Sequence, residues 1–143
     1  MFLRSLFALL VIVGWMGCGF HVKESDTVVW HEKKREVRYQ IEDNDFVIVN
    51  GEKRFNRALY GSHTGFRVEA GDIPEFGLYM PRLGGTMRLG ISNGQNSKWL
   101  IDADRVEARY RPGSMIYSIQ DELLGSGTMY LHLLALSDAD GMI

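Results

Sequence analysis

The sequence predicts an all-β fold, an antiparallel β-sandwich preceded by an N-terminal signal peptide. Apolar and polar residues alternate with a period of two in several short segments after residue 30, as in strands with one buried face. Sixteen glycines and only three prolines favour short strands and tight turns over a helical bundle. Beyond the first twenty residues, no segment carries a convincing helical stripe of apolar side chains.

Residues 1–19 read as a signal peptide. Arg4 provides the positive start, and the apolar stretch from Leu6 to Met16 is too short to span a bilayer comfortably. Small residues follow, as signal cleavage requires. The sequence therefore predicts an exported protein, located in the periplasm or held as a lipoprotein at the outer membrane or cell surface.

Cys18 is the only cysteine in the chain, so no internal disulfide can form. Gly17-Cys18 resembles the end of a bacterial lipobox, which predicts lipidation of Cys18 and tethering to a membrane. Trp15 and Met16 depart from the lipobox pattern, and Gly17-Cys18-Gly19 also suits ordinary signal peptidase and soluble export. A buried structural helix is the third interpretation of this segment.

Residues 20–29 form a polar linker, and residues 30–143 form the predicted sandwich domain. Asn50-Gly51 predicts a hairpin, Gly84-Gly85 a connecting loop and Pro112-Gly113 a turn. The strands are expected, in order, in 35–41, 46–55, 65–72, 75–81, 86–92, 104–111, 114–120 and 127–137.

The last predicted strand is apolar on both faces. Met129, Leu131 and Leu133 alternate with Tyr130 and Leu134, which predicts cover on both sides. Asp140-Gly141 predicts a further hairpin whose second strand begins at Met142. An uncovered apolar edge is an aggregation hazard, so we expect a chain truncated at its C-terminus. The alternative is a central final strand in a chain that ends there naturally.

Catalytic and ligand-binding signatures are scarce in this sequence. The net charge of -2 gives no basic footprint for nucleic acid. The four histidines lack metal-ligand spacing, and no recognised nucleophile or phosphate-binding motif is present. No metal, cofactor or catalytic residue is therefore assigned.

Two stretches carry the candidate substrate contacts. RFNRALYG (54–61) and AGDIPEFGLYMPRLGG (70–85) mix arginine, asparagine and carboxylates with aromatic residues. Planar polar groups beside aromatic rings are what a sugar site needs, since they combine bidentate hydrogen bonds with a stacking surface. Corners of the sandwich, with charges capping turns, are the alternative interpretation.

The runs FVIVNGEKRFNRALYG, FRVEAGDIPEFGLYMP and GGTMRLGI resemble the N-terminal part of an uncharacterised family of large exported bacterial proteins, domain of unknown function 4450. Its members occur with polysaccharide-degrading systems. The resemblance covers roughly Trp30 to Ile143. It implies a β-sandwich followed by an (α/α) barrel of the six-hairpin glycosidase type, which holds the catalytic acid and base. It also implies that the motif positions Asn56, Arg57, Tyr60 and Arg82 face the sugar cleft.

The expected function is that of an N-terminal accessory β-sandwich in an exported, glycoside hydrolase-like protein of polysaccharide degradation, inactive alone. Its expected partners are the missing C-terminal helical domain and a glycan. The alternatives are a stand-alone carbohydrate- or protein-binding surface lipoprotein module and a purely structural fragment. An exposed aromatic platform from Trp30, Trp99 or Tyr79 would favour binding. A bare apolar face on residues 129–136 would favour the accessory role.

Overall fold

The computed structural model describes residues 27–30 and 33–143, and side chains from residue 36 onward. The predicted signal peptide and its lipidation site Cys18 lie outside the described residues. The described residues fall into two units, one that ends at Glu36 and one that comprises Val37–Ile143. In the first unit, β1 (Thr27–Trp30) pairs antiparallel with β2 (Lys33–Glu36).

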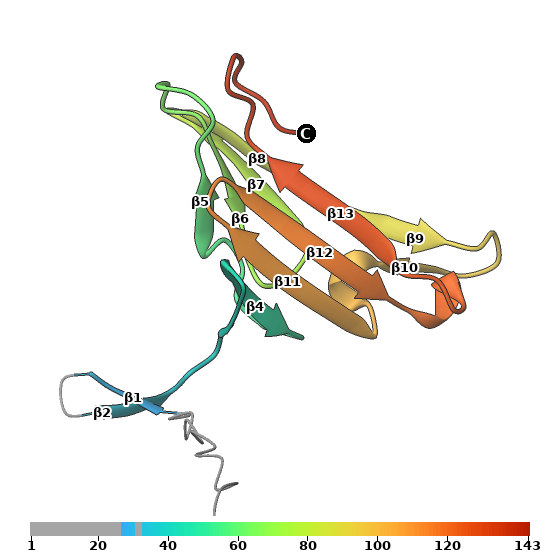
Figure 1. The fold of residues 1–143 in the computed structure, drawn as a ribbon. Coiled ribbons are helices and arrows are strands. Elements are labelled where there is room, and N and C mark those ends of the chain that lie inside the picture. The colour runs from blue at the N-terminus through green and yellow to red at the C-terminus, as the bar shows by residue number, and fades with distance from the viewer. Residues whose placement is uncertain (1–26, 31–32) are drawn as a thin grey trace, which may run out of the picture. The chain divides into compact units, whose positions relative to one another are not determined.

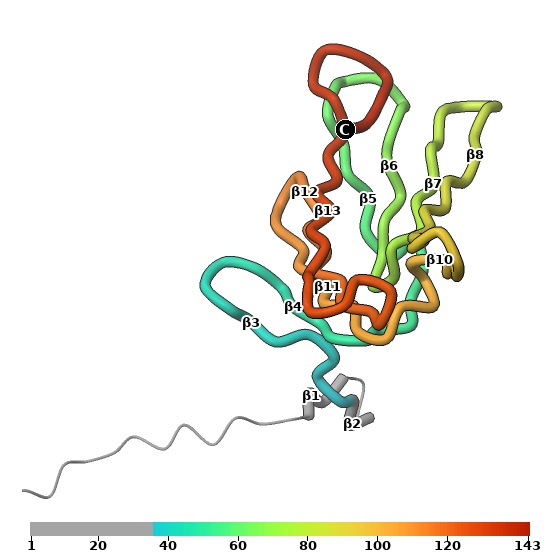
Figure 2. Tube along the Cα trace, turned by 90° about the vertical axis from the view of Figure 1, so that its right-hand side faces the viewer, coloured from blue at the N-terminus to red at the C-terminus, as the bar shows by residue number. Residues whose placement is uncertain are grey.

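The second unit confirms the predicted all-β fold with antiparallel sheets packed as a β-sandwich (Figures 1 and 2). One sheet has five strands in the order β13-β12-β11-β4-β3, and the other has four in the order β5-β6-β7-β8. A separate antiparallel pair, β9 and β10, follows β8. The five-stranded sheet contains β3 (Gln40–Glu42), β4 (Asp45–Val49), β11 (Arg105–Arg111), β12 (Ser114–Gln120) and β13 (Met129–Leu134). The remaining strands are β5 (Arg57–Leu59), β6 (Arg67–Ala70), β7 (Glu75–Met80), β8 (Leu83–Arg88), β9 (Gly90–Ser92) and β10 (Ser97–Trp99).

The core lies between the inner faces of the two sheets. Val68 and Phe76 from the four-stranded sheet meet Tyr117 and Ile119 from the five-stranded sheet, and all four side chains are fully buried. The rings of Phe76 and Tyr117 are 5.8 Å apart between centroids. The Tyr117 hydroxyl donates a 2.8 Å hydrogen bond to the Gly71 carbonyl, which satisfies its polar group inside the core.

The period-two pattern gave the correct faces in the middle of the chain. Val68 and Ala70 of β6 are buried, as are Val106 and Ala108 of β11, while the charged residues between them point outward. The turn at Gly113, with φ of 87°, joins β11 to β12 as predicted.

The predicted hairpin at Asn50-Gly51 is wrong, although Asn50 does adopt a positive φ of 49°. The strand before it, β4, pairs with β3 and β11 and not with the residues that follow. Asn50 instead exchanges hydrogen bonds with Val106, donating its backbone N–H to the carbonyl and accepting from Val106 N–H with its side chain. The long-range ladder with β11 therefore outweighs the local turn signal.

Two strand boundaries also differ from the prediction. The segment 35–41 is not one strand, because β2 ends at Glu36 and β3 begins at Gln40, and Ile41 is 74% exposed. Gly84 and Gly85 lie within β8, and the connection from β7 turns at Arg82, which has a φ of 70°. Two short 3₁₀ helices, Leu100–Asp102 and Glu122–Leu124, are the described helical segments. None of the described residues forms a helix of the length and apolar character that a membrane crossing requires.

The chain returns after β13, as Asp140-Gly141 predicts. Ala135 forms an antiparallel bridge with Met142, and Leu134 and Ile143 exchange two backbone hydrogen bonds of 2.9 and 3.1 Å. This C-terminal hairpin lies beside the β5–β6 loop in both views (Figures 1 and 2). The Thr64 hydroxyl donates to Asp140 at 2.5 Å, so the hairpin links the two sheets at this end.

Candidate functional site

Asn56 and Arg57, two of the predicted substrate contacts, lie half-buried at a polar cluster centred on Asp72. The Asn56 amide donates to Asp72 at 3.1 Å and to the Tyr39 hydroxyl at 2.8 Å. The Arg57 guanidinium lies between two rings, 4.7 Å from the Tyr39 centroid and 5.1 Å from that of Tyr110. Both side chains are thus already engaged with other residues of the protein. Their contact with a sugar stays a prediction.

Asp72 is the anchor of this cluster. It is buried and accepts hydrogen bonds from the Arg38 guanidinium, the Tyr39 hydroxyl and, at 3.0 Å, the Lys53 backbone N–H. Burial raises the pKa of Asp72, but the hydrogen bonds from Tyr39, Lys53 and Asn56 outweigh it and hold that pKa below its usual range. Burial raises the pKa of Tyr39, and the neighbouring Asp72 raises it further. In this cluster the Asp72 carboxylate is therefore ionised and the Tyr39 phenol is neutral, an arrangement that suits a structural role.

Tyr60 and Arg82, the other two predicted contacts, reach the same end of the four-stranded sheet. Tyr60 directly follows β5, and Arg82 lies in the turn between β7 and β8. The β5–β6 loop contacts this turn closely, because a Cβ added at Gly65 would lie 2.9 Å from the Pro81 ring. Both residues are exposed, so this end of the sheet offers side chains to a ligand.

Three side chains form a row across the outer face of the four-stranded sheet: Tyr60, Arg67 and Tyr79, here called the tyrosine row. Arg67 pairs with Tyr79 in the β6–β7 ladder, and the β5–β6 register extended by one residue brings Tyr60 opposite Arg67. The Arg67 guanidinium carbon lies 3.8 Å from the Tyr79 ring centroid, a close cation–π contact. On the other side, Tyr79 pairs with Gly84, which has no side chain to cover the ring.

The guanidinium in this row is held in place by a neighbouring carboxylate. Arg67 Nε donates to Glu69, and this hydrogen bond raises the pKa of Arg67 above its ordinary value. Among the described residues, the remaining nitrogens of Arg67 make no hydrogen bond, and neither do the hydroxyls of Tyr60 and Tyr79. The tyrosine row thus combines the Tyr79 side chain, which is 41% exposed, with guanidinium and hydroxyl donors that make no hydrogen bond to the described residues.

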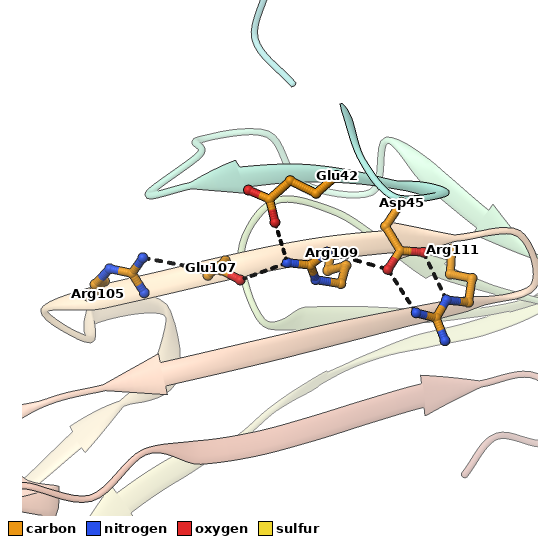
Figure 3. Close-up of polar contacts among 6 residues, drawn as sticks. All are labelled: Glu42, Asp45, Arg105, Glu107, Arg109 and Arg111. Atoms are coloured by element: carbon orange, nitrogen blue, oxygen red, sulfur yellow. Dashed lines mark hydrogen bonds and ion pairs between the residues drawn. The ribbon is translucent and has the colours of Figure 1, made fainter. Parts of the chain in front are cut away.

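The outer face of the five-stranded sheet carries a different arrangement, a row of ion pairs along β11 (Figure 3). Buried Asp45 accepts two 2.8 Å hydrogen bonds from Arg111. Arg109 donates to Glu42 at 2.7 Å and also approaches Asp45 and Glu107. The Arg111 hydrogen bonds hold the pKa of Asp45 below its usual range. These charges neutralise one another and leave little to bind a ligand.

Residues 80–143 match the model of a family described as a domain of unknown function (DUF4450). The DUF4450 match supports the expected family and runs from the last residue of β7 through the C-terminal hairpin. It contains Arg82 and β11, whereas Tyr60, Arg67 and Tyr79 precede it. Neither the comparison with curated proteins nor that with solved structures gave a match.

The sequence did not single out Arg67 as a site residue, because an outward charge on a strand is usually only a solvated side chain. Only the strand register brings it over Tyr79. Tyr39 was likewise missed, since its partner Asp72 is 33 residues away. Within residues 27–30 and 33–143, no cluster of three metal-ligating side chains forms.

Proposed function

We propose that this chain is a non-catalytic, accessory β-sandwich of an exported carbohydrate-active protein and that the tyrosine row contacts its glycan. The observation that carries the proposal is the Tyr79 ring, with Arg67 over one side and Gly84 as its neighbour on the other. A sugar ring can stack its C–H face on an aromatic surface of this kind. The arginine beside it then donates to neighbouring hydroxyls.

The non-catalytic part of this proposal is supported by the carboxylates near the tyrosine row, which are paired with arginines. Glu69 pairs with Arg67, and buried Glu75 pairs with Arg88 at 2.6 Å and with Arg54 at 3.1 Å. Glycoside hydrolysis needs one carboxyl group as acid and a second as base or nucleophile, both directed at the substrate. Two carboxylates that are already engaged with arginines are poorly suited to either role.

An accessory role also needs a surface for the rest of the protein, and β13 offers one. Its outer face exposes 68% of Tyr130 and 42% of Leu134. Inward-facing Leu133 is buried in the core, so only one face of this strand is packed. This outer face, on which exposed His132 stands between Tyr130 and Leu134, supports docking of a further domain, for which a C-terminal helical barrel is the proposed partner. Export, with lipidation at Cys18, belongs to the same proposal.

The same chain as a self-sufficient binding module is the second candidate. It is favoured by the two exposed aromatic residues named as discriminators, Tyr79 and Trp99. The side chain of Trp30 lies outside those that the structure describes. Glycan recognition by the tyrosine row is common to both functions, so a binding experiment addresses it first.

Affinity electrophoresis of the full chain tests this recognition, with soluble xylan, arabinan, mannan, mixed-linkage glucan and pectin cast in the gel. We expect at least one polymer to retard the protein and Tyr79→Ala to weaken that binding about tenfold, or 1.4 kcal/mol. Tyr130→Ala is the matched control, because it removes an exposed tyrosine from the other sheet. Retardation by no polymer, or equal weakening by both substitutions, would overturn the proposal. Release of reducing sugar by the purified chain would overturn its non-catalytic part.

A further inference from the structure

A second exposed aromatic residue, Trp99, lies on the hairpin formed by β9 and β10. It is 52% exposed and pairs with Gly90 in the ladder. A Cβ added at Gly90 would lie 3.4 Å from the Trp99 ring, so the indole rests against this glycine. The missing side chain at Gly90 thus fixes the ring along the hairpin while half of its surface remains open.

The ring borders an open hollow of about 320 Å³, lined also by Ser92, Ser97 and Lys98. Lys98 is held from below by Asp121 at 2.7 Å and Asp104 at 3.0 Å, so its charge is already neutralised. The Ser97 hydroxyl makes no hydrogen bond among the described residues. The hollow therefore offers an aromatic wall and the Ser97 hydroxyl without an unpaired positive charge, which suits a neutral sugar better than an anion.

The hollow and the tyrosine row open on one continuous outer track. From Thr86 to Ser92, exposed residues alternate with residues packed against the core, and the pattern continues without a break through Leu89 between β8 and β9. Gly84 lies two residues before Thr86 in the same strand, so it is on the same side of the chain as Thr86 and Gly90. These two glycines pair with Tyr79 and Trp99 respectively. Six residues of extended chain separate them, about 20 Å.

We infer that Trp99 forms a second sugar subsite and that the ligand is an extended polysaccharide lying along β8 and β9 from Tyr79 to Trp99. This rests on the proposed function, since it assigns the kind of glycan that the tyrosine row recognises. A monosaccharide or a chain end fills one subsite only. An internal stretch of polymer reaches both, and its affinity gains from the two contacts being linked.

Titration of the full chain with oligosaccharides of increasing length, prepared from the retarding polymer, tests the inference. We expect wild-type affinity to rise with length until both aromatics are reached. Trp99→Ala should remove that rise, about tenfold for the longest oligosaccharide, and leave the shortest unchanged. Trp99→Phe should restore most of it, because a ring is kept. Tyr130→Ala again serves as control.

A direct readout uses the fact that the chain has three tryptophans. In the Trp15→Phe, Trp30→Phe variant, Trp99 is the sole indole, and its emission should shift to shorter wavelength with long oligosaccharides and remain unchanged with short ones. Length-independent affinity that still depends on Tyr79 would overturn this inference and leave the proposed function intact. If no oligosaccharide binds, the proposed function fails, and the second subsite fails with it.

Discussion

The outer faces of the two sheets use arginine in different ways. On β11, Arg109 and Arg111 point into carboxylates, and buried Asp45 receives both (Figure 3). On β6, Arg67 donates one nitrogen to Glu69, and its guanidinium carbon lies 3.8 Å from the ring centroid of an exposed tyrosine. On β11 the arginines are paired with carboxylates from neighbouring strands, whereas on β6 the arginine is paired through one nitrogen and also contacts an aromatic ring.

The difference shows which features turn a charged strand into a site. Both faces alternate charged residues along a strand, so their sequences look alike. The carboxylates beside β11 come from the neighbouring strands β3 and β4. In contrast, Arg67 of β6 has Tyr79 of β7 as its ladder partner, and Tyr79 in turn pairs with Gly84 of β8. The residues that the register places beside an arginine therefore decide whether that arginine stabilises the sheet or is available to a ligand.

The largest expected effect comes from removing one carboxylate from each face. Asp45→Ala leaves two arginines without their buried partner, and we expect a fall in melting temperature of more than about 5 °C. Glu69→Ala removes a more exposed partner and should change it by less than about 2 °C. Calorimetry of both variants checks this. Equal losses would mean that the two faces do not differ in this way.

The pH dependence of stability should follow the buried carboxylates. Hydrogen bonds from Arg111 and Lys98 lower the pKa values of Asp45 and Asp121 below the unfolded value of about 3.9. A depressed folded pKa contributes stability that is present above the unfolded pKa and lost as pH falls through the folded one. Melting temperature should therefore be nearly level from pH 7 to about 5 and fall below about 4.

Asp45→Asn should make that acid fall shallower, because one of the titrating groups is gone. Asp138→Asn, in the exposed C-terminal turn, is the control and should leave the slope unchanged. Melting curves from pH 7 down to about 2.5 measure both. A steeper acid fall in Asp45→Asn would contradict the assignment of Asp45 as a stabilising, ionised group.

The smallest effects are expected on the outer face of β13. Leu134→Lys replaces a 42% exposed side chain and should change the free energy of unfolding by no more than about 0.5 kcal/mol while raising solubility. Leu136→Lys, at a half-buried position against Gly141, should cost about 1 kcal/mol. Urea unfolding and light scattering measure both. A large loss in Leu134→Lys would show that this face is already covered.

The sequence was sufficient for those parts of the fold in which one face of a strand is buried along its length. Alternation in β6 and β11 identified the buried side chains because burial imposes the same period that the backbone does. It failed at Asn50, where a local hairpin signal competes with pairing to Val106, 56 residues away. Such long-range pairing leaves no short-range trace in the sequence.

Prediction of the site was less complete for the same reason. Tyr60 and Arg82 were predicted, and the structure brings them to one end of one sheet. Asn56 and Arg57, from the same motif, lie at the Asp72 cluster, because the strand position of each residue decides its face. Arg67 could not be singled out without the register that sets it over Tyr79.

The order of strands in the two sheets also determines which parts of the chain can fold first. Strands β5 to β8 are consecutive, so that sheet can form without any residue beyond 88. β4 must wait for β11, and until then Phe46 and Ile48 have no strand beside them on that side. Until β11 pairs with it, the β3–β4 hairpin is therefore open to pairing with a second chain.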